Sequence, residues 1–319
     1  MEYDESIDQE FEKGRGPKKF QYNELATATD NFAESKKLGE GGSGSVYRGN
    51  LVGEGTHEVA IKRVSKAPKY SKKEYISEVR IISQLRHRNL VELIGWCHDH
   101  NEFLIVYELM HNGSLDAHLY HKDTVLPWSL RHQIALGLGS ALLYLHTEFK
   151  KCVLHRDIKP SNVMLDSSFN AKLGDFGVSR LIDHNSAAQT LPAGTMGYIA
   201  PECLQKGQAT TQSDIYSFGV VLLEIACGRR PLVAQDDENI TILVKWVWHL
   251  YGNNSILDAI DSRLNGEYKA QEAKRLLIVG LWCAQPDYNL RPSIRQAVSV
   301  LQYESPLPNL PSKMPVMRN

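Results

Sequence analysis

The chain has 319 residues, of which 42% are hydrophobic and 23% are charged, and its formal net charge is −1. A chain of this length can bury a large core and is near the size at which cores divide into two domains. The balanced charge gives no basic field of the kind that would favour nucleic acid as a partner. The cysteines are scattered and odd in number, which indicates reduced thiols rather than a disulfide framework: Cys97, Cys152, Cys203, Cys227 and Cys283.

A membrane span is not expected, because no apolar run reaches the roughly 18 residues that a span needs. The longest run, residues 218–226, is interrupted by Gly219 and Glu224 and predicts a buried helix. The chain begins with charged residues rather than with the basic and then apolar sequence of a signal peptide. We therefore expect a chain that is located on the cytoplasmic side.

The N-terminal region is rich in charge. Within residues 1–19, six acids precede four bases and few residues could be buried, which predicts a disordered arm. The bases could contact an anionic membrane surface, but a solvated tail is favoured. A short helical extension is predicted over residues 20–35, with a helix over residues 20–32 that Asn23 caps.

Residues 36–110 combine several strand patterns with a single helical one. Apolar residues at helical spacing predict a helix over residues 72–85. Strands are predicted over residues 38–49 with a glycine-rich turn, 59–64, 90–98 and 103–108. The sequence Cys97-His98-Asp99-His100 could in principle hold a metal ion, but the chain has no CxxC motif and this interpretation is disfavoured.

From Ser114 onward helical patterns dominate. Helices are predicted over residues 128–146, 214–227, 241–251, 271–283 and 293–301. A β-rich part followed by a larger helical part predicts an α+β, bilobal fold.

A run of glycines lies within the first predicted strand pair. Residues 39–46 read GEGGSGSV and fit the pattern GxGxxGxV. Glycines let backbone N–H groups approach phosphates without a clash from a Cβ atom. The same glycine pattern occurs in dinucleotide-binding folds, where a helix follows it. Here a strand is expected to follow, which disfavours a dinucleotide site.

The next predicted strand contains a lysine with a small neighbour. Ala60 and Lys62 point to the same face of the strand. Ala60 leaves room for a flat ring, and Lys62 can then reach phosphate groups. A buried lysine needs a counter-charge. Glu78 and Glu74, one turn apart on the predicted helix, are the candidates.

Two short motifs are the most informative part of the chain, HRDIKPSN from residue 155 and DFG from residue 175. Asp157 can accept or orient the proton of an attacking hydroxyl, and Lys159 can neutralise charge on a transferred phosphoryl group. Asn162 and Asp175 can bind Mg²⁺, a hard cation that prefers oxygen ligands. Each residue type also occurs in turns, but turns do not explain the four residues in this order.

Together these motifs resemble those of eukaryotic protein kinases. The resemblance covers residues 36–304, with an N-lobe over 36–110 and a C-lobe over 111–304, before a C-terminal tail over 305–319. It implies a protein-kinase-like fold, ATP as the phosphoryl donor and Mg²⁺ as the metal, with Mn²⁺ as a substitute. The catalytic residues that it implies are Asp157, Lys159, Lys62 and Glu78, and the metal ligands are Asn162 and Asp175.

The same resemblance implies a nucleotide site. Tyr107 takes the gatekeeper position, and the hinge that reads adenine is Glu108-Leu109-Met110. The full set of nucleotide-binding residues comprises Leu38, Gly39, Glu40, Gly41, Gly42, Ser43, Gly44, Val46, Ala60, Lys62, Tyr107, Glu108, Met110, Asp116 and Met164. Elsewhere it implies that Asp214 braces the catalytic loop and that Arg291 pairs with Glu202, in the Ala-Pro-Glu motif that closes the activation segment.

Lys159 and Thr195 resemble serine/threonine rather than tyrosine kinases. The sequence FQYNELATATDNF over residues 20–32 and the ending Pro306-Leu307-Pro308 resemble plant receptor-like kinases, in particular the cytoplasmic part of L-type (legume) lectin-domain receptor kinases. The implied function is phosphorylation of serine and threonine in proteins, including the chain's own activation segment in trans. An upstream receptor complex is the further implied partner.

Regulation is expected near the catalytic motif. Arg156 is interpreted as an unpaired arginine that needs an anion, which a phosphorylated activation segment would supply. Thr190 is the favoured phosphosite, and Thr195 is expected to line the substrate-facing loop. Plain solvated hydroxyl groups are the alternative interpretation for the candidates Ser179, Ser186, Thr190 and Thr195.

Two other functions are weighed. A pseudokinase, acting as an ATP-binding or signalling scaffold, usually lacks an equivalent of Lys62, Asp157 or Asp175, and all three are present. A small-molecule kinase of the same fold is disfavoured by the Ala-Pro-Glu motif and the activation segment, which suit a protein substrate.

Overall fold

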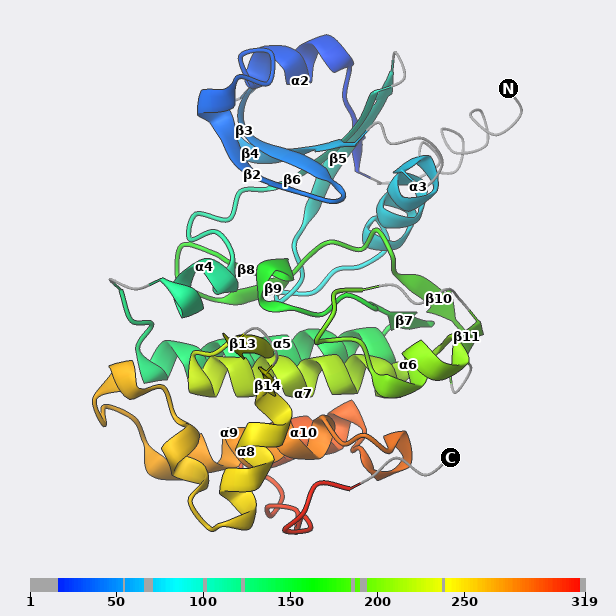
Figure 1. Cartoon of the computed structure of the whole chain (residues 1–319). Coiled ribbons are helices and arrows are strands. Elements are labelled where there is room, and N and C mark those ends of the chain that lie inside the picture. Colours follow the sequence, from blue (N-terminus) through cyan, green and yellow to red (C-terminus); the bar gives the residue numbers. More distant parts are fainter. Residues whose placement is uncertain are drawn as a thin grey trace. The chain divides into compact units, whose positions relative to one another are not determined.

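The computed structural model describes residues 17–53, 55–65, 71–99, 102–121, 124–184, 187–189, 194–236 and 239–315. These residues form two compact units. Unit 1 contains the described residues up to Arg86 together with Val91–Met110, and unit 2 contains His87–Leu90 together with the described residues from His111. Unit 1 is built around a sheet and unit 2 is mainly helical (Figure 1), as the sequence predicts.

Unit 1 contains a six-stranded sheet in the order β1-β5-β6-β4-β3-β2. All neighbouring strands are antiparallel except β1 and β5, which are parallel. The strands are β1 (Lys18–Lys19), β2 (Lys37–Gly41), β3 (Gly44–Gly53), β4 (Gly55–Val64), β5 (Leu93–Asp99) and β6 (Glu102–Glu108). The helices are α2 (Tyr22–Ala28), the 3-10 turn η1 (Glu34–Lys36) and α3 (Ser71–Ile82).

The two faces of this sheet differ in character. Tyr47 pairs with Ile61, which pairs with Val106, so these apolar side chains share one face, where the buried Leu25 and Ala26 of α2 pack against them. Residues next to them in sequence therefore point to the opposite face. Lys62 is one of these, because it is paired with Val46.

The start of the described chain differs from the prediction. Residues Lys18–Lys19 were expected to lie in a disordered arm, but they form β1 and pair with Gly95 and Trp96 of β5. A Cβ atom on Gly95 would lie 2.2 Å from the carbonyl oxygen of Lys18, so only glycine permits this approach. The Lys19 ammonium lies over the Trp96 ring, 5.2 Å from its centroid, and this contact helps to hold a very short edge strand.

The predicted helix over residues 20–32 is shorter in the structure. Helix α2 begins after Gln21, and Asn23 lies inside it, so the predicted Asn23 cap was wrong. The helix ends because Asp30, Asn31 and Phe32 all have left-handed backbone angles, with φ between 53° and 57°. The Thr29 hydroxyl accepts a hydrogen bond from the Phe32 N–H at 3.1 Å and closes this turn. The strain of about 1–2 kcal/mol per residue is offset by burial of the Phe32 ring against Tyr47.

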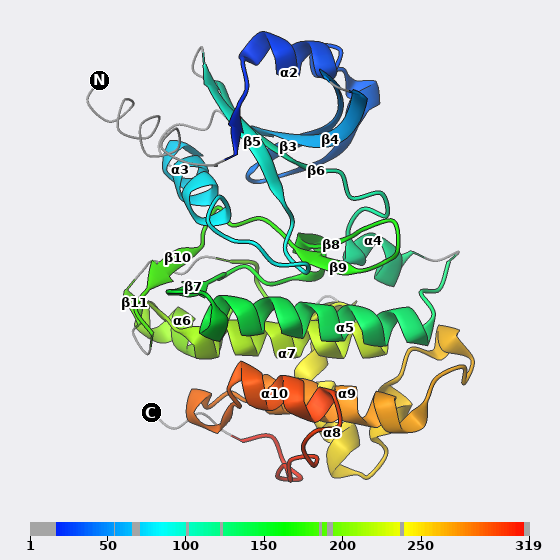
Figure 2. The ribbon, with the colours of Figure 1, turned by 180° about the vertical axis from the view of Figure 1, so that it is seen from behind.

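Unit 2 is organised around two long helices, α5 and α7, which lie side by side in both views (Figures 1 and 2). Its α-helices are α4 (Leu115–Tyr120), α5 (Trp128–Leu143), α6 (Pro201–Lys206), α7 (Thr211–Cys227), α8 (Leu243–Gly252), α9 (Ala270–Cys283) and α10 (Ile294–Leu301). The shorter turns are η2, a π-helix (Tyr144–Glu148), and the 3-10 turns η3 (Pro160–Asn162), η4 (Ile256–Ala259), η5 (Ser262–Leu264) and η6 (Tyr288–Leu290).

Four short strand pairs complete unit 2. They are β7 (Cys152–Leu154) with β10 (Arg180–Ile182), β8 (Val163–Leu165) with β9 (Ala171–Leu173), β11 (Ala188–Gln189) with β12 (Gln208–Ala209), and β13 (Leu232–Asp236) with β14 (Asn239–Ile242). The predicted C-terminal tail is described as far as residue 315, and it lies on α8. There the Trp248 indole N–H donates to the Pro311 carbonyl at 3.1 Å, and the Tyr251 hydroxyl donates to the Leu310 carbonyl at 3.2 Å.

The centre of unit 2 depends on close contact between α7 and α9. The predicted buried helix over residues 218–226 is confirmed, because α7 is buried throughout residues 217–227. A Cβ atom on Gly219 would lie 2.6 Å from the backbone nitrogen of Ala284 and 2.7 Å from the carbonyl oxygen of Gly280. The two helix backbones therefore touch at Gly219, and no side chain fits between them.

Replacement of Gly219 by alanine should therefore destabilise the chain, by about 1–3 kcal/mol in the free energy of unfolding. Gly139→Ala on α5 is the matched control. A Cβ atom on Gly139 would meet side-chain atoms rather than backbone, those of Val298 at 3.0 Å and Phe218 at 3.5 Å. Alanine also favours a helix by up to about 1 kcal/mol over glycine. Urea unfolding followed by circular dichroism measures both, and equal stability of the two variants would contradict this contact.

Candidate active site

In unit 1, Lys62 forms the predicted ion pair. Its Nζ lies 2.9 Å from Oε2 and 3.2 Å from Oε1 of Glu78, and both residues are buried. The prediction of Glu78 rather than Glu74 as the partner is therefore confirmed. The Tyr107 hydroxyl also donates a hydrogen bond to Glu78 Oε1, a contact that sequence reasoning missed. The sequence placed Tyr107 only at the gatekeeper position, and the structure adds that it lies opposite Ala60 in the neighbouring strand of the sheet.

The glycine-rich loop joins β2 to β3 in unit 1. Gly44 has φ of 136°, and a Cβ atom there would lie 2.2 Å from the Arg63 carbonyl oxygen, so the protein's own packing requires this glycine. Gly39, Gly41 and Gly42 differ, because a Cβ atom on any of them would meet no protein atom within 4 Å. Neither packing nor a positive φ accounts for these three glycines.

The other predicted nucleotide residues are divided between the units. Unit 1 places Val46, Ala60 and Lys62 on one face of the sheet, with Tyr107 beside Ala60. Also in unit 1 are Leu38 (52% exposed), Glu40, Ser43, Glu108 and the buried Met110. Unit 2 holds Asp116, which accepts a hydrogen bond from the Ser114 hydroxyl at 2.6 Å, and Met164, which lies in β8.

In unit 2 the catalytic motif is held by one buried carboxylate. Asp214 accepts hydrogen bonds from the backbone N–H groups of His155 and Arg156, each at 2.8 Å, and lies 3.0 Å from Nε2 of His146. Burial alone would raise the pKa of Asp214, but His146, His155 and the Arg156 N–H outweigh it and hold the pKa below its ordinary value. The predicted role of Asp214 as a brace for this loop is confirmed.

Asp157 lies within a compact polar group. Lys159 Nζ is 2.7 Å from Asp157 Oδ2 and donates to the Thr195 hydroxyl at 2.9 Å. The Thr195 hydroxyl in turn donates to Asp157 Oδ1 at 3.0 Å. The structure thus brings the predicted residues Asp157 and Lys159 together. The Thr195 hydroxyl is hydrogen bonded to Asp157, and the Lys159 ammonium lies beside it. The double contact of Thr195 was not predicted.

A backbone hydrogen bond brings the segments of the two predicted metal ligands, Asn162 and Asp175, side by side. The Asn162 amide donates to the Asp157 carboxylate at 3.0 Å, which orients the amide group through its nitrogen. The Asn162 carbonyl accepts a hydrogen bond at 2.9 Å from the N–H of Gly174, the residue before Asp175. Asp175 has φ of 61°, a left-handed conformation that non-glycine residues rarely adopt.

Two expectations about the activation segment were wrong. Arg156 was interpreted as unpaired, but its guanidinium donates to the Val178 carbonyl at 2.7 Å. Ser179 was a candidate phosphosite, but it has no exposed surface and its hydroxyl donates to the His155 carbonyl at 3.1 Å. Backbone carbonyl groups carry no sequence signal, so neither contact was foreseeable. Thr190 and Ser186 lie outside the described residues.

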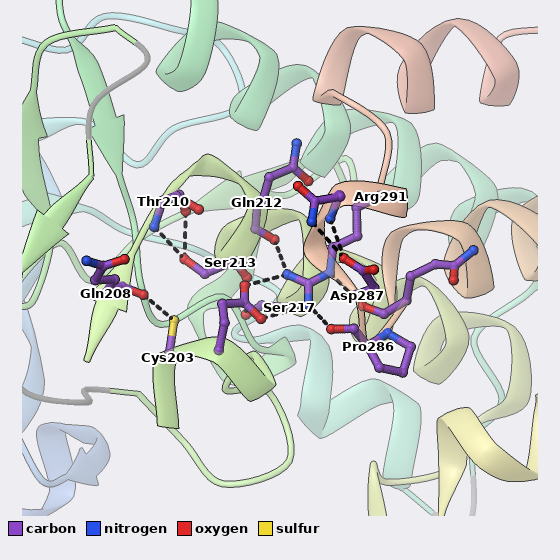
Figure 3. Close-up of polar contacts among 12 residues, drawn as sticks. Cys203, Gln208, Thr210, Gln212, Ser213, Ser217, Pro286, Asp287 and Arg291 are labelled. Carbon is purple, nitrogen blue, oxygen red and sulfur yellow. Dashed lines mark hydrogen bonds and ion pairs between the residues drawn. The ribbon is translucent and has the colours of Figure 1, made fainter. Parts of the chain in front are cut away.

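The end of the activation segment is anchored by a buried ion pair. Arg291 binds Glu202 through two hydrogen bonds, at 2.6 and 2.8 Å, which confirms the predicted pair. The same guanidinium donates to the carbonyl groups of Gln212 and Pro286 (Figure 3). Arg291 therefore fastens α6 to the start of α7 and to the loop after α9.

The fold and these motifs define a protein kinase. The family model described as "Protein kinase domain" matches residues 32–301, so the chain belongs to the protein kinase family. Members of this family generally use ATP and Mg²⁺.

Within that family, the chain is similar to plant receptor kinases. L-type lectin-domain containing receptor kinase IX.1 of Arabidopsis thaliana is 56% identical over 315 residues, which cover 98% of this chain and 48% of that protein. Receptor kinase IX.2 of the same plant is 52% identical over 321 residues, covering 98% of this chain and 47% of that protein. In Oryza sativa subsp. japonica, L-type lectin-domain containing receptor kinase SIT2 is 44% identical over 306 residues (95% and 45%).

The chain thus spans about half the length of the curated relatives it matches. Among the helices that the structure describes, none has the length and apolar character that would let it cross a membrane.

Asp214→Asn should lower the free energy of unfolding at pH 7 by about 2–3 kcal/mol, because an amide offers one acceptor oxygen where three donors converge. A lowered pKa means that the charged form stabilises the fold at pH values above 3.8, the ordinary pKa. This stabilisation is lost as the pH falls through the folded-state pKa, so the difference between wild type and variant should narrow below pH 3.8.

Asp166→Asn is the control for this experiment. Its carboxylate also has a lowered pKa and accepts two backbone hydrogen bonds, but in a more exposed turn. A loss of about 1 kcal/mol or less is expected there. Equal losses in the two variants, measured by urea unfolding between pH 3 and 7, would show that Asp214 is not the stronger anchor.

Proposed function

We propose that this chain is a serine/threonine protein kinase that transfers the γ-phosphoryl group of ATP to hydroxyl groups of proteins, including its own activation segment. The observation that carries this proposal is the group formed by Asp157, Lys159 and Thr195 in unit 2. A hydroxyl hydrogen bonded to Asp157 at 3.0 Å is the geometry that a general base needs. The Lys159 cation beside it can stabilise negative charge that develops on the phosphoryl group.

Lys62 and Glu78 are proposed to position the ATP phosphates. A buried ion pair contributes little net stability, because desolvation of both charges offsets their attraction. Such a pair is therefore better explained by function than by folding. Glu78 binds the lysine ammonium through both carboxylate oxygens, and Tyr107 binds the same carboxylate, so the position of the ammonium is fixed.

The glycine-rich loop fits a role in binding the triphosphate. Three of its glycines have no packing reason within the protein, so the bare backbone N–H groups are better explained by the close approach of a ligand. The small side chain of Ala60 and the neighbouring Val46 on the same face suit an apolar ring. We propose the remaining predicted residues, from Leu38 to Met110 in unit 1 and Asp116 and Met164 in unit 2, as the rest of the nucleotide set.

Asn162 and Asp175 fit a hard divalent cation. The Asn162 amide nitrogen is occupied by Asp157, so its side-chain oxygen is the atom available to a metal. The strained conformation of Asp175 is the kind of feature that persists at functional sites. When bound, Mg²⁺ would neutralise phosphate charge and fix the phosphate geometry. The role of the two side chains is to hold the cation through oxygen atoms.

Specificity for serine and threonine is supported by the contact of Thr195 with both Lys159 and Asp157. We propose that Thr195, which lies beside these two residues, limits how far the acceptor hydroxyl can stand from its own backbone. Because the relatives are named as receptor kinases, we also propose that the chain acts in signalling linked to a receptor complex.

Asp157→Asn and Lys62→Met should each reduce phosphate transfer from labelled ATP by at least about a hundredfold, the usual scale for loss of a general base or an electrostatic group. Nucleotide binding, measured separately by calorimetry, should persist in Asp157→Asn. Asp183→Asn, on a side chain that is 84% exposed, is the matched control and should keep full activity. A wild-type protein that binds ATP with Mg²⁺ but transfers no phosphate would favour the pseudokinase alternative.

Thr190→Ala should lower the activity of the autophosphorylated enzyme by about tenfold, which corresponds to the loss of one charge-assisted hydrogen bond. The proposed anion site is Arg156 with Arg180. Burial is the largest cause that lowers the pKa of Arg156, and the positive charge of Arg180 is the next, so the two arginines are close enough for one anion to interact with both. Ser186→Ala is the control in the same segment. Equal kinetics of dephosphorylated and phosphorylated wild type would rule this switch out.

A further inference from the structure

The residues that follow Thr195 form a partly apolar surface in unit 2. Met196 is 66% exposed, and Leu232 on β13 is 38% exposed. A Cβ atom on Gly197 would lie 3.0 Å from the Pro231 side chain and 3.3 Å from that of Leu232, so these two segments are in contact. Since Thr195 binds Asp157 directly, this surface lies beside the group that we propose to receive the acceptor hydroxyl.

Two arginines directly precede Pro231, and both are exposed. The Arg230 guanidinium lies over the ring of Tyr120, 4.1 Å from its centroid, and the Arg229 guanidinium lies over Trp246 at 4.2 Å. Stacking on an aromatic ring restricts a guanidinium and leaves its N–H groups directed to the side. No salt bridge joins either arginine to a carboxylate in the described part of the chain.

The buried acid beneath this surface carries little negative charge at neutral pH. The hydroxyl groups of Tyr120 and Tyr198 both donate to Glu224 Oε1. Burial raises the pKa of Glu224 to about 8, and the two tyrosine hydrogen bonds and Arg230 only partly offset it. Asp116 on α4 also faces Glu224 and contributes to the raised pKa.

A series of contacts within unit 2 connects Arg230 to the reaction centre. Arg230 rests on Tyr120, which shares Glu224 with Tyr198, and the Tyr198 N–H donates to the Thr195 carbonyl at 3.1 Å. Arg230 is thus connected to the loop that contacts Asp157.

We propose that Arg229 and Arg230 recognise an acidic side chain of the protein substrate close to the acceptor serine or threonine. This inference rests on the proposed kinase function and names the class of its substrate. A carboxylate would bind through charge-assisted hydrogen bonds to a pre-oriented guanidinium. A lysine or arginine at the same place would meet two cations and be rejected by like-charge repulsion.

Peptides with one acceptor serine test this proposal. A single glutamate is moved through each flanking position, and matched sets carry glutamine or lysine at the same positions. For wild type with Mg-ATP we expect kcat/KM for at least one glutamate peptide to exceed that of its glutamine match by about fivefold or more, mainly through KM. Arg230→Gln and Arg229→Gln should each reduce that ratio toward one, and Arg230→Glu should shift the preference toward the lysine peptide.

Arg295→Gln on α10 removes the same charge from an exposed arginine elsewhere in unit 2 and should leave the preference unchanged. Wild-type phosphorylation of glutamate and glutamine peptides at equal kcat/KM would overturn the inference while the proposed function stands. Loss of the preference in Arg295→Gln would overturn it as well, because the effect would then be one of net charge. A wild type that phosphorylates no peptide and no protein would instead overturn the proposed function itself.

Discussion

The catalytic loop depends on the fully buried carboxylate of Asp214. An unpaired charge at such a position would cost several kcal/mol, so the carboxylate can be buried only when its hydrogen-bond donors are in place. Two of the donors are consecutive backbone N–H groups, those of His155 and Arg156. Binding both at once holds Arg156 at φ of 73°, a conformation that arginine otherwise avoids. The next residue is Asp157. The backbone conformation from which its side chain extends is therefore set by the buried carboxylate of Asp214.

The helices that hold Asp214 explain why the strained backbone of the catalytic loop is stable. Asp214 lies in α7, whose backbone touches α9 at Gly219, and its third donor, His146, lies in the π-helix at the end of α5. A π-turn shifts the side chains that follow it relative to a regular helix, and such turns are frequent at functional sites. The strained residues of the loop are thus held by helices in a packed core.

Sequence motifs predicted the site better than they predicted the fold around it. The pairs of Lys62 with Glu78 and Glu202 with Arg291 were foreseeable from the resemblance to protein kinases, whereas the need for a counter-charge alone left Glu74 as an alternative to Glu78. Contacts to backbone carbonyls, such as those of Arg156 and Ser179, were not, since every residue offers one. Strand β1 was missed for a similar reason. Two lysines have no strand pattern, and their pairing depends on the distant Gly95.

The described parts of the activation segment are fixed on both sides of Thr195. Before it, the buried Phe176 packs edge-on against His155, and the Ser179 hydroxyl binds the His155 carbonyl. After it, Ser217 of α7 donates to the Tyr198 carbonyl at 2.7 Å, and Glu202 is locked to Arg291. Both ends of this segment are fixed to the same helical core, so neither end can shift freely when a phosphate or a substrate binds between them. Binding there would therefore change the contacts that lie between the two fixed ends. The hydrogen bonds of Thr195 with Lys159 and Asp157 are among these contacts.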